Sequence, residues 1–386
     1  MIRRFNKRIA ILTGGGDVQP LNAVIASAIE SANRNNFQLI GFKRGWQGVL
    51  ENDYFSLNNK IVDLFIGGTI LKSSRVNLAK IEGGAELVKN NVAEIGLDGL
   101  IVIGGEDTLS NSFCLKDVQQ VLISKTIDND VGIADGRKVV NYFTLGHPTA
   151  AEKISSFVSL SEGLRSTAYS HERIIVVESM GMHAGWLALS SSMGHPDFII
   201  IPEFTLDYAS FLSKVITKYR KQKNLIIVIA EGARWADGSY ISADENEKDS
   251  FGHPRFKGAA NLLAEKMKKD LKKFFDTRNV NSVNPSYLYR SGKPNKLDLS
   301  AAAELGRAAV NYFKSKRDDT TLLTTNFRDG KLVRGSYSLS GVSNIDGLHR
   351  FVTERFYDPN TMNTTKEGNK FMRRIVAEHS SMNYGI

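Results

Sequence analysis

Four short segments combine the residue types that handle phosphate groups. Residues 13–17 (TGGGD) contain glycines and a carboxylate, and residues 67–75 (GGTILKSSR) contain glycines, hydroxyls and cations. Two further segments, 104–108 (GGEDT) and 125–130 (KTIDND), bring carboxylates next to glycine or lysine. Glycine lets backbone N–H groups approach a phosphate closely, and lysine and arginine supply the opposite charge. Together the segments indicate chemistry on a phosphorylated substrate.

Each residue type in these segments suits one part of such a reaction. Lys72, Arg75 and Lys125 could bind phosphate groups. Glu106 could hold Mg²⁺ directly or through water, and Asp128 could take a proton from a hydroxyl. Taken singly, each segment also has a structural explanation, since glycines form turns, aspartates cap helices and lysines lie on surfaces. Four such turns at four strand ends favour the functional interpretation.

Alternating strand and helix patterns must position these segments. Short runs rich in β-branched residues predict strands at 8–13, 38–42, 99–103, 120–125, 173–178, 198–202 and 224–230. Apolar residues at helical spacing predict helices at 21–33, 84–95, 149–166, 184–193, 208–219 and 299–313. The polar stretch 234–256 is predicted to be a loop. This alternation is typical of a mostly parallel α/β sheet covered on both faces, which binds ligands where its strands end.

Composition excludes several classes of protein. The 386 residues are 42% hydrophobic and 24% charged, as in a globular protein of two or three domains rather than a disordered or collagenous chain. Cys114 is the single cysteine, so no internal disulfide can form, which fits a reducing cytoplasm. The apolar runs are far shorter than the ~20 residues of a membrane-spanning helix. We therefore expect a cytoplasmic protein with no membrane segment.

The net charge of +9 attracts polyanions, which include nucleic acid as well as phosphorylated metabolites. Much of the excess lies in 257–273, where lysines flank apolar residues at helical spacing. This pattern is typical of a solvated helix face. Because the sequence has no basic patch interleaved with aromatic residues and no zinc-ligand spacing, we expect no nucleic-acid partner.

The order and spacing of the segments resemble the phosphofructokinase family. The resemblance covers most of the chain and includes the four segments above with SHER (170–173), MGMHAGW (180–186), AEG (230–232) and PSYLYR (285–290). It implies an α/β fold of two Rossmann-like three-layer domains, with mostly parallel sheets and a shared cleft. The implied phosphoryl-donor domain is 1–147, completed by about 290–345. The implied sugar-phosphate domain is 148–289, completed by about 346–386.

The resemblance also implies a role for each matching residue. Asp128 matches the general base that deprotonates the sugar 1-hydroxyl, with Asp130 and Lys125 beside it in the catalytic set. The implied donor-binding residues are Gly15, Lys72, Arg75, Asp107 and Lys125. The implied sugar-phosphate contacts are Thr126, Arg173, Met180, Gly181, Glu231, Tyr287 and Arg290. Glu106 stands where the family usually has a magnesium-associated aspartate, so Mg²⁺ is the expected cofactor. Arg173 is expected to serve the adjacent subunit of a homodimer or homotetramer.

Three residues bear on the identity of the phosphoryl donor. Family members that use ATP have glycines at the positions of Asp107, Asn111 and Lys125. A carboxylate at Asp107 would repel the α-phosphate of a nucleotide, and Asn111 stands where the nucleoside would lie. Lys125 would bind the compact, highly charged pyrophosphate. The resemblance therefore implies a reversible, Mg²⁺-assisted transfer from pyrophosphate to the 1-hydroxyl of fructose 6-phosphate.

Departures from the family pattern leave alternatives open. They are Gln19-Pro20 after the first aspartate, Glu106 in place of Asp, Met182 and Asn281 in place of cations, and Ser291-Gly292 after Arg290. Lost cations favour another acceptor, such as sedoheptulose 7-phosphate, or a weakly active regulatory homologue. An ATP-dependent 6-phosphofructokinase is a further alternative. A nicotinamide dehydrogenase would need a dinucleotide fingerprint, which the sequence lacks.

Overall fold

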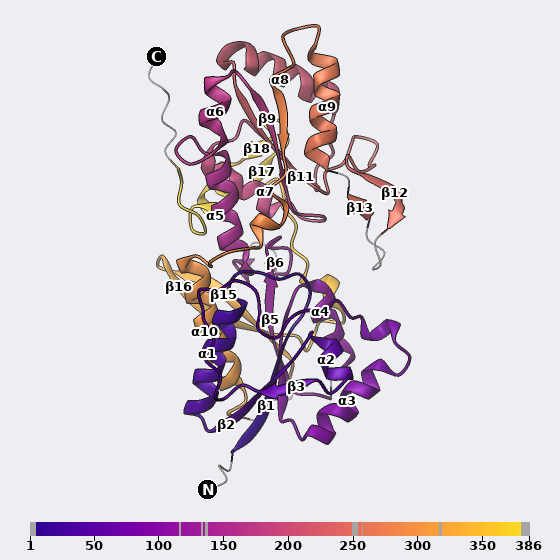
Figure 1. Ribbon diagram of the computed structural model, residues 1–386, viewed down its shortest axis with the longest axis vertical. Helices are drawn as coiled ribbons and strands as arrows, with labels where there is room; N and C mark the ends of the chain where they lie inside the picture. Colours follow the sequence, from indigo (N-terminus) through magenta and orange to yellow (C-terminus); the bar gives the residue numbers. More distant parts are fainter. Residues whose placement is uncertain are drawn as a thin grey trace. The chain divides into compact units, whose positions relative to one another are not determined.

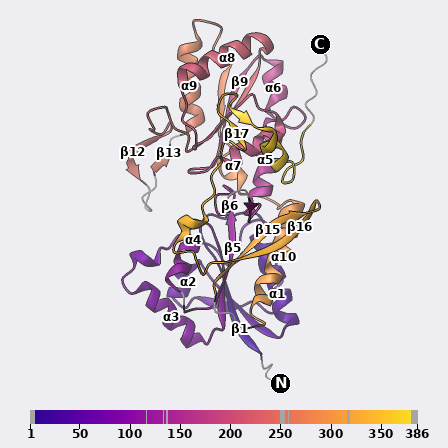
Figure 2. The same cartoon turned by 180° about the vertical axis from the view of Figure 1, so that it is seen from behind.

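The computed structural model describes residues 5–115, 117–132, 134–135, 138–248, 254–256, 258–315 and 319–379. The chain forms two compact units, whose elements are labelled in Figures 1 and 2. Unit 1 consists of residues 1–149 and 290–350, and unit 2 of residues 150–289 and 351–386. The chain therefore passes between the units after Thr149, Tyr289 and Arg350.

An eight-stranded sheet forms the centre of unit 1, in the order β16-β15-β5-β4-β1-β2-β3 with β8 paired to β5. Its strands are β1 (Lys7–Thr13), β2 (Phe37–Phe42), β3 (Tyr54–Ser56), β4 (Gly99–Gly104), β5 (Gln120–Thr126), β8 (Leu145–Gly146), β15 (Thr321–Arg328) and β16 (Lys331–Ser338). Neighbouring strands are parallel except at the two edges, where β3 and β16 run antiparallel. A small antiparallel pair, β6 (Ala134–Asp135) and β7 (Lys138–Val139), lies outside this sheet.

Helices cover both faces of this sheet (Figure 1). Those of unit 1 are α1 (Leu21–Arg34), α2 (Trp46–Leu50), α3 (Gly84–Ile95), α4 (Glu106–Ser110), α10 (Lys296–Tyr312) and the short 3-10 turns η1 (Leu78–Lys80), η2 (Asn111–Cys114) and η5 (Ile345–Leu348). The helices α1 and α10 pack so closely that a Cβ on Gly306 would lie only 2.5 Å from the carbonyl oxygen of Val24. Side chains of α2 and α3 pack with those of β1, β2 and β4 in one buried apolar cluster.

A four-stranded parallel sheet, in the order β10-β11-β9-β14, forms the centre of unit 2. The strands of unit 2 are β9 (Ile174–Ser179), β10 (Phe198–Ile200), β11 (Leu225–Ala230), β14 (Val280–Val283) and the antiparallel pairs β12 (Ala243–Lys248) with β13 (Pro254–Phe256) and β17 (Tyr357–Asp358) with β18 (Asn363–Thr364). Its helices are α6 (Leu164–Ser170), α7 (Trp186–Ser190), η3 (Ser191–Gly194), α8 (Tyr208–Gln222), α9 (Ala259–Leu271), η4 (Ser286–Tyr289) and α11 (Lys366–Met372), while α5 (His147–Val158) begins in unit 1.

The predicted α/β class with mostly parallel sheets is confirmed, and two local predictions are wrong. The helix predicted at 149–166 ends at Val158, and α6 begins separately after Gly163. Any Cβ on Gly163 would lie 2.2 Å from the carbonyl oxygen of Phe157, so the chain turns too tightly there to continue a helix. The loop predicted at 234–256 contains the β12–β13 pair. Among the described residues, no helix has the length and hydropathy needed to cross a membrane.

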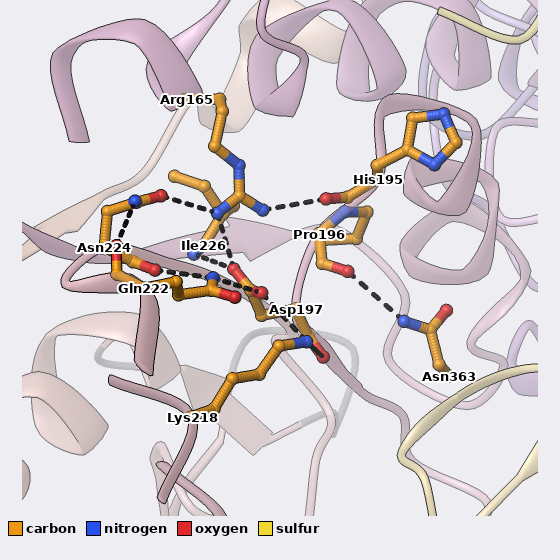
Figure 3. A network of polar contacts seen from close by, with 9 residues as sticks. All are labelled: Arg165, His195, Pro196, Asp197, Lys218, Gln222, Asn224, Ile226 and Asn363. Atoms are coloured by element: carbon orange, nitrogen blue, oxygen red, sulfur yellow. Dashed lines mark hydrogen bonds and ion pairs between the residues drawn. The ribbon is translucent and has the colours of Figure 1, made fainter. Parts of the chain in front are cut away.

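A buried carboxylate network fastens the amino-terminal end of β11 in unit 2 (Figure 3). Asp197, only 6% exposed, accepts hydrogen bonds from the Ile226 N–H at 2.8 Å and from Gln222 Nε2 at 2.8 Å. Its oxygens also pair with Arg165 Nη1 at 2.6 Å and with Lys218 Nζ at 2.9 Å. One side chain thereby joins α6, α8 and β11.

Replacing Asp197 by alanine is expected to lower the free energy of unfolding by about 3–5 kcal/mol, since it leaves the Arg165 guanidinium largely buried without its carboxylate. Urea unfolding followed by circular dichroism measures the effect. The matched control is Glu30→Ala, which removes an exposed pair with Arg34 and should cost at most about 1 kcal/mol. Equal effects of the two substitutions would contradict the prediction.

Candidate active site

The glycine turn after β1 brings three segments of unit 1 together. Gly15 has a positive φ of 79°, and its N–H donates to the carbonyl oxygen of Ser74 at 3.0 Å. A Cβ on Gly15 would lie 3.3 Å from Lys125 Nζ, and Lys125 Nζ donates to the carbonyl oxygen of Gly16. Because its N–H is already used, Gly15 contributes room for close approach rather than a hydrogen-bond donor.

Cations gather at this turn. Lys125 is 2% exposed, and burial lowers its pKa to about 7, with the positive charges of Arg290 and Arg75 acting in the same direction and Asp17 opposing them. A Cβ on Gly16 would lie 2.5 Å from Arg290 Nη1, so the Arg290 guanidinium rests against the turn. Lys72 and Arg75 are exposed. The structure thus places Arg290, assigned to the sugar phosphate from the sequence, among the cations expected to bind the donor.

The end of β5 is held by a buried carboxylate on α10. β8 pairs with β5 at Lys125 and Thr126, and Asp298 fixes the chain directly after β8. Asp298, fully buried, accepts the N–H groups of Gly146 and Thr149, both at 2.9 Å. A rigid β8 and α5 therefore support the strand end that carries Lys125.

The carboxylates of the segment 128–130 follow β5 in a tight turn. Asn129 takes the left-handed conformation, with φ 57°, and its Oδ1 accepts the Thr144 N–H at 2.9 Å. This turn leaves Asp128 and Asp130 flanking a buried residue. Burial and the charge of Asp128 raise the pKa of Asp130 to about 7, with Glu106 adding to the rise. Asp130 thus has a raised proton affinity, close to that expected of a general base near neutral pH.

Glu106 opens α4, at the end of β4, and its Oε2 lies 3.3 Å from His349 Nε2. Within the described part of the chain, no group of three or more His, Cys, Asp or Glu residues could hold a metal by itself. Mg²⁺ commonly keeps several waters and binds one or two carboxylates together with substrate phosphates. The negative charge of Glu106 adds to the rise in the pKa of Asp130, and Asp130 Oδ1 is buried with no hydrogen-bond partner among the described residues. This donor set fits Mg²⁺.

Asn111 fills the space beside the glycine turn that follows β4, at residues 104–105. Its Oδ1 accepts the Leu78 N–H at 2.7 Å, and its Nδ2 donates to the carbonyl oxygens of Val76 at 2.8 Å and Asp107 at 3.1 Å. The carboxamide is 2% exposed. Asn111 is therefore a fixed wall between α4 and the segment 76–78. Asp107, by contrast, is exposed on the first turn of α4.

Trp46 lies behind the same turn. Its indole N–H donates to the carbonyl oxygen of Thr108 at 2.9 Å, and the ring is 2% exposed. The backbone that carries Glu106 and Asp107 is therefore fastened to α2.

A pocket of about 410 Å³ opens at the carboxyl end of β9 in unit 2. Its lining consists of Glu178, Ser179, Met180, Glu231, Gly258, Asn284, Ser286 and Tyr287. Gly181, with φ 126°, donates its N–H to Glu231 Oε1 at 3.2 Å, which fixes Glu231 beside Met180. The structure thus brings Met180, Gly181, Glu231 and Tyr287 together, as the sequence predicts.

Two residues that line this pocket, Glu178 and Asn284, were not identified as site residues from the sequence. Glu178 Oε2 accepts the Ala260 N–H at 2.9 Å, and its Oε1 accepts Asn284 Nδ2 at 2.7 Å. Burial raises the pKa of Glu178 above its usual value. The signal in the sequence is an acidic residue at the end of an otherwise apolar strand. Glu178 joins β9, α9 and the segment after β14 into one wall.

Comparison with known proteins identifies the family. The phosphofructokinase family model matches residues 8–313. The chain belongs to the phosphofructokinase family. A pyrophosphate–fructose 6-phosphate 1-phosphotransferase of Dictyoglomus thermophilum is 39% identical over 310 residues, which cover 79% of this chain and 85% of that protein. The ATP-dependent 6-phosphofructokinase 3 of Streptomyces coelicolor is 37% identical over 310 residues, which cover 78% of this chain and 86% of that protein.

Solved phosphofructokinase structures share the fold. A pyrophosphate-dependent phosphofructokinase from Nitrosospira multiformis has a TM-score of 0.79 at 21% identity, covering 98% of this chain and 95% of that one. Phosphofructokinase from Saccharomyces cerevisiae has a TM-score of 0.68 at 23% identity, covering 86% of this chain and 44% of that one. Relatives named for pyrophosphate and relatives named for ATP occur at similar identity. Similarity therefore assigns the chain to the family without identifying its phosphoryl donor.

Arg173 of this phosphofructokinase does not line the pocket of its own chain. It precedes β9, and Met180 follows the other end of this six-residue strand, which spans about 20 Å. Its Nη1 donates to Thr167 Oγ1 at 2.6 Å. The predicted contact with a neighbouring subunit stays a prediction, as do the other assigned ligand contacts.

Proposed function

We propose that the chain is a pyrophosphate-dependent phosphofructokinase, which moves a phosphoryl group reversibly from pyrophosphate to the 1-hydroxyl of fructose 6-phosphate. The observation that carries this proposal is the buried ammonium of Lys125 at the glycine turn, beside Arg75 and Arg290. Concentrated positive charge suits a small, highly charged donor. Asn111 supports it, because its carboxamide is held by hydrogen bonds at the position where the family resemblance implies that a nucleoside would lie.

In this mechanism the protein acts mainly by placing charges. Lys125, Arg75 and Arg290 bind the phosphates and stabilise the charge of the transferring group. Asp128 accepts the proton of the attacking hydroxyl, and the carboxylate of Asp130 lies two residues further along the same turn. Glu106 would hold Mg²⁺, which when bound neutralises charge on the phosphate oxygens.

The pocket in unit 2 supports the sugar-phosphate assignment. Glu178, Glu231 and Ser286 offer acceptors for sugar hydroxyls. None of the described residues that line it is a lysine or arginine. A phosphate bound there needs a cation from elsewhere, and we assign that role to Arg173 of an adjacent subunit in a homodimer or homotetramer.

Mixing two impaired variants tests the shared site. Arg173→Ala subunits keep the base but should have a raised KM for the sugar phosphate, and Asp128→Asn subunits keep the arginine but lack the base. A hybrid interface that pairs an intact base with an intact neighbouring arginine should therefore recover activity at sugar-phosphate concentrations where each variant alone has little. Absence of recovery, after mass spectrometry has verified subunit exchange, would overturn the assignment.

The donor is tested directly by offering pyrophosphate or ATP with fructose 6-phosphate, and then with sedoheptulose 7-phosphate, at fixed Mg²⁺. Coupling the bisphosphate product to NADH oxidation measures the rate. We expect turnover with pyrophosphate and fructose 6-phosphate, and release of pyrophosphate in the reverse direction from fructose 1,6-bisphosphate and phosphate. Faster turnover with ATP would overturn the donor assignment, and no turnover with either donor would overturn the function. ATP is the second candidate because ATP-dependent relatives are 36–37% identical.

The rate should depend on pH through two groups that titrate near neutrality. Below about pH 7 Asp130 gains a proton, which removes the negative charge that supports the base, so kcat should fall as pH falls. Above about pH 7 Lys125 loses its proton in the free enzyme, so the KM for pyrophosphate should rise as pH rises. Lys125→Arg keeps its charge and should lose the alkaline dependence alone. An alkaline limb unchanged in that variant would contradict the assignment.

A further inference from the structure

A segment beyond the family match reaches the candidate catalytic turn. The family model ends at residue 313, whereas the segment 348–350 runs alongside residues 130–132. The Gly132 N–H donates to the carbonyl oxygen of Leu348 and the Arg350 N–H to that of Asp130, both at 2.7 Å. Val131 and His349 form an antiparallel bridge between these contacts. The chain leaves unit 1 directly after Arg350.

The side chain of Arg350 holds the turn from inside. Arg350 is 3% exposed, and its Nη2 donates to the carbonyl oxygen of Asn129 at 3.0 Å. Its Nη1 donates to the carbonyl oxygens of Asn141 and of Tyr142, the latter at 3.2 Å. One planar guanidinium thus joins the left-handed residue of the catalytic turn to the strand connection that follows it.

The cost of burying this charge argues for more than packing. A buried cation is strongly unfavourable unless it is fully hydrogen-bonded and compensated. Here three carbonyl oxygens accept hydrogen bonds from the Arg350 guanidinium. The positive charge of Arg350 also opposes the rise in the pKa of Asp130. A lysine could not satisfy three carbonyls in a plane, because its ammonium is a compact point charge on a flexible stem.

We propose that Arg350 is a positioning residue that fixes the turn at Asn129, and thereby the direction of Asp128, for phosphoryl transfer. This inference rests on the proposed function for its kinetic consequence only. From the part of the chain that the family model matches, the Thr144 N–H donates to Asn129 Oδ1, and Asn141 Nδ2 donates to the carbonyl oxygen of Val131 at 3.2 Å. Arg350 is buried and acts through the backbone carbonyl oxygens that it contacts.

Steady-state kinetics of Arg350→Lys and Arg350→Met test the inference. A misdirected base should lower kcat by roughly 10²-fold while both substrate KM values stay within about threefold, because displacements near 1 Å cost about that much in rate. Arg350→Lys should be less impaired than Arg350→Met. The control is Arg355→Met, an exposed arginine paired with Glu367 further along the chain, which should keep wild-type kcat.

Gly132→Ala tests the same contact without removing the arginine. A Cβ at Gly132 would lie 3.2 Å from Arg350 Cζ, so the guanidinium must shift by a few tenths of an ångström. We expect a smaller loss of kcat in the same direction. This variant also serves if the substitutions at Arg350 fail to fold, which circular dichroism and gel filtration would show.

Hydrogen exchange separates this inference from the proposed function. Amides of residues 129–132 should exchange at least tenfold faster in Arg350→Lys than in the wild-type protein, whatever reaction the protein catalyses. Unchanged protection, or folded variants that retain wild-type kcat, would overturn the role of Arg350. A wild-type protein without phosphofructokinase activity but with increased exchange in the variant would overturn the proposed function alone.

Discussion

Asp128→Asn should lower kcat by ~10²- to 10⁴-fold, the usual cost of removing a positioned general base. The amide has nearly the shape of the carboxylate but cannot accept the proton of the attacking hydroxyl. The KM for fructose 6-phosphate should change little, because the substitution preserves size and the pocket in unit 2 is untouched. Initial rates in the pyrophosphate-coupled assay measure both quantities.

Two further aspartates serve as controls for this result. Asp358→Asn alters a carboxylate on a surface turn of unit 2 and should leave kcat unchanged. Asp130→Asn removes the charge beside the base and one charged donor of the candidate Mg²⁺ site, and should reduce kcat less than Asp128→Asn because the proton acceptor remains. A near wild-type kcat in Asp128→Asn would mean that another group accepts the proton.

Lys125→Ala should raise the KM for pyrophosphate by roughly 10- to 100-fold, because a charge-assisted contact of this kind contributes about 1.5–3 kcal/mol. The KM for fructose 6-phosphate should change much less. Lys331→Ala is the control, because Lys331 is an exposed lysine on the edge strand β16 and has no assigned role in binding.

The exclusion of nucleotides is tested separately. Asp107→Gly removes an exposed carboxylate from α4 and should admit measurable turnover with ATP. The double variant Asp107→Gly with Lys125→Gly should prefer ATP over pyrophosphate. If neither variant gains any ATP-dependent activity while both remain folded, charge at these two positions does not select the donor.

The sequence predicted that three turns of unit 1 lie together, because each of them follows a strand that is easily recognised. The turns after β1, β4 and β5 come directly after continuous apolar runs, and parallel neighbouring strands bring their carboxyl ends to one edge. Local pattern therefore sufficed to place Lys125 and Asp128 near the glycine turn. The family resemblance, not the strand pattern, grouped Met180 with Glu231, and the structure shows that the strands they follow, β9 and β11, are neighbours.

Long-range pairing decided what the sequence could not predict. β15 joins the sheet beside β5 although almost 200 residues separate them along the chain, as Figure 2 shows. No periodicity indicates such a partner. Likewise, nothing in the segment 285–290 indicates that Arg290 reaches Gly16, and Arg350 has no local signature as a residue of the catalytic turn. These positions depend on which remote surfaces the folded chain brings into contact.

The hydrogen bond from Trp46 to the carbonyl oxygen of Thr108 makes Trp46 a fluorescent reporter of the turn after β4. Indole emission responds to the polarity and hydrogen bonding of its surroundings, and this ring is attached to the backbone next to Asp107. The other two tryptophans belong to unit 2, where Trp186 packs against Phe356 and Trp235 against Tyr208. With those two replaced by phenylalanine, Trp46 becomes the sole emitter. If the proposed function is correct, its fluorescence should change when pyrophosphate is added, without any sugar phosphate or turnover.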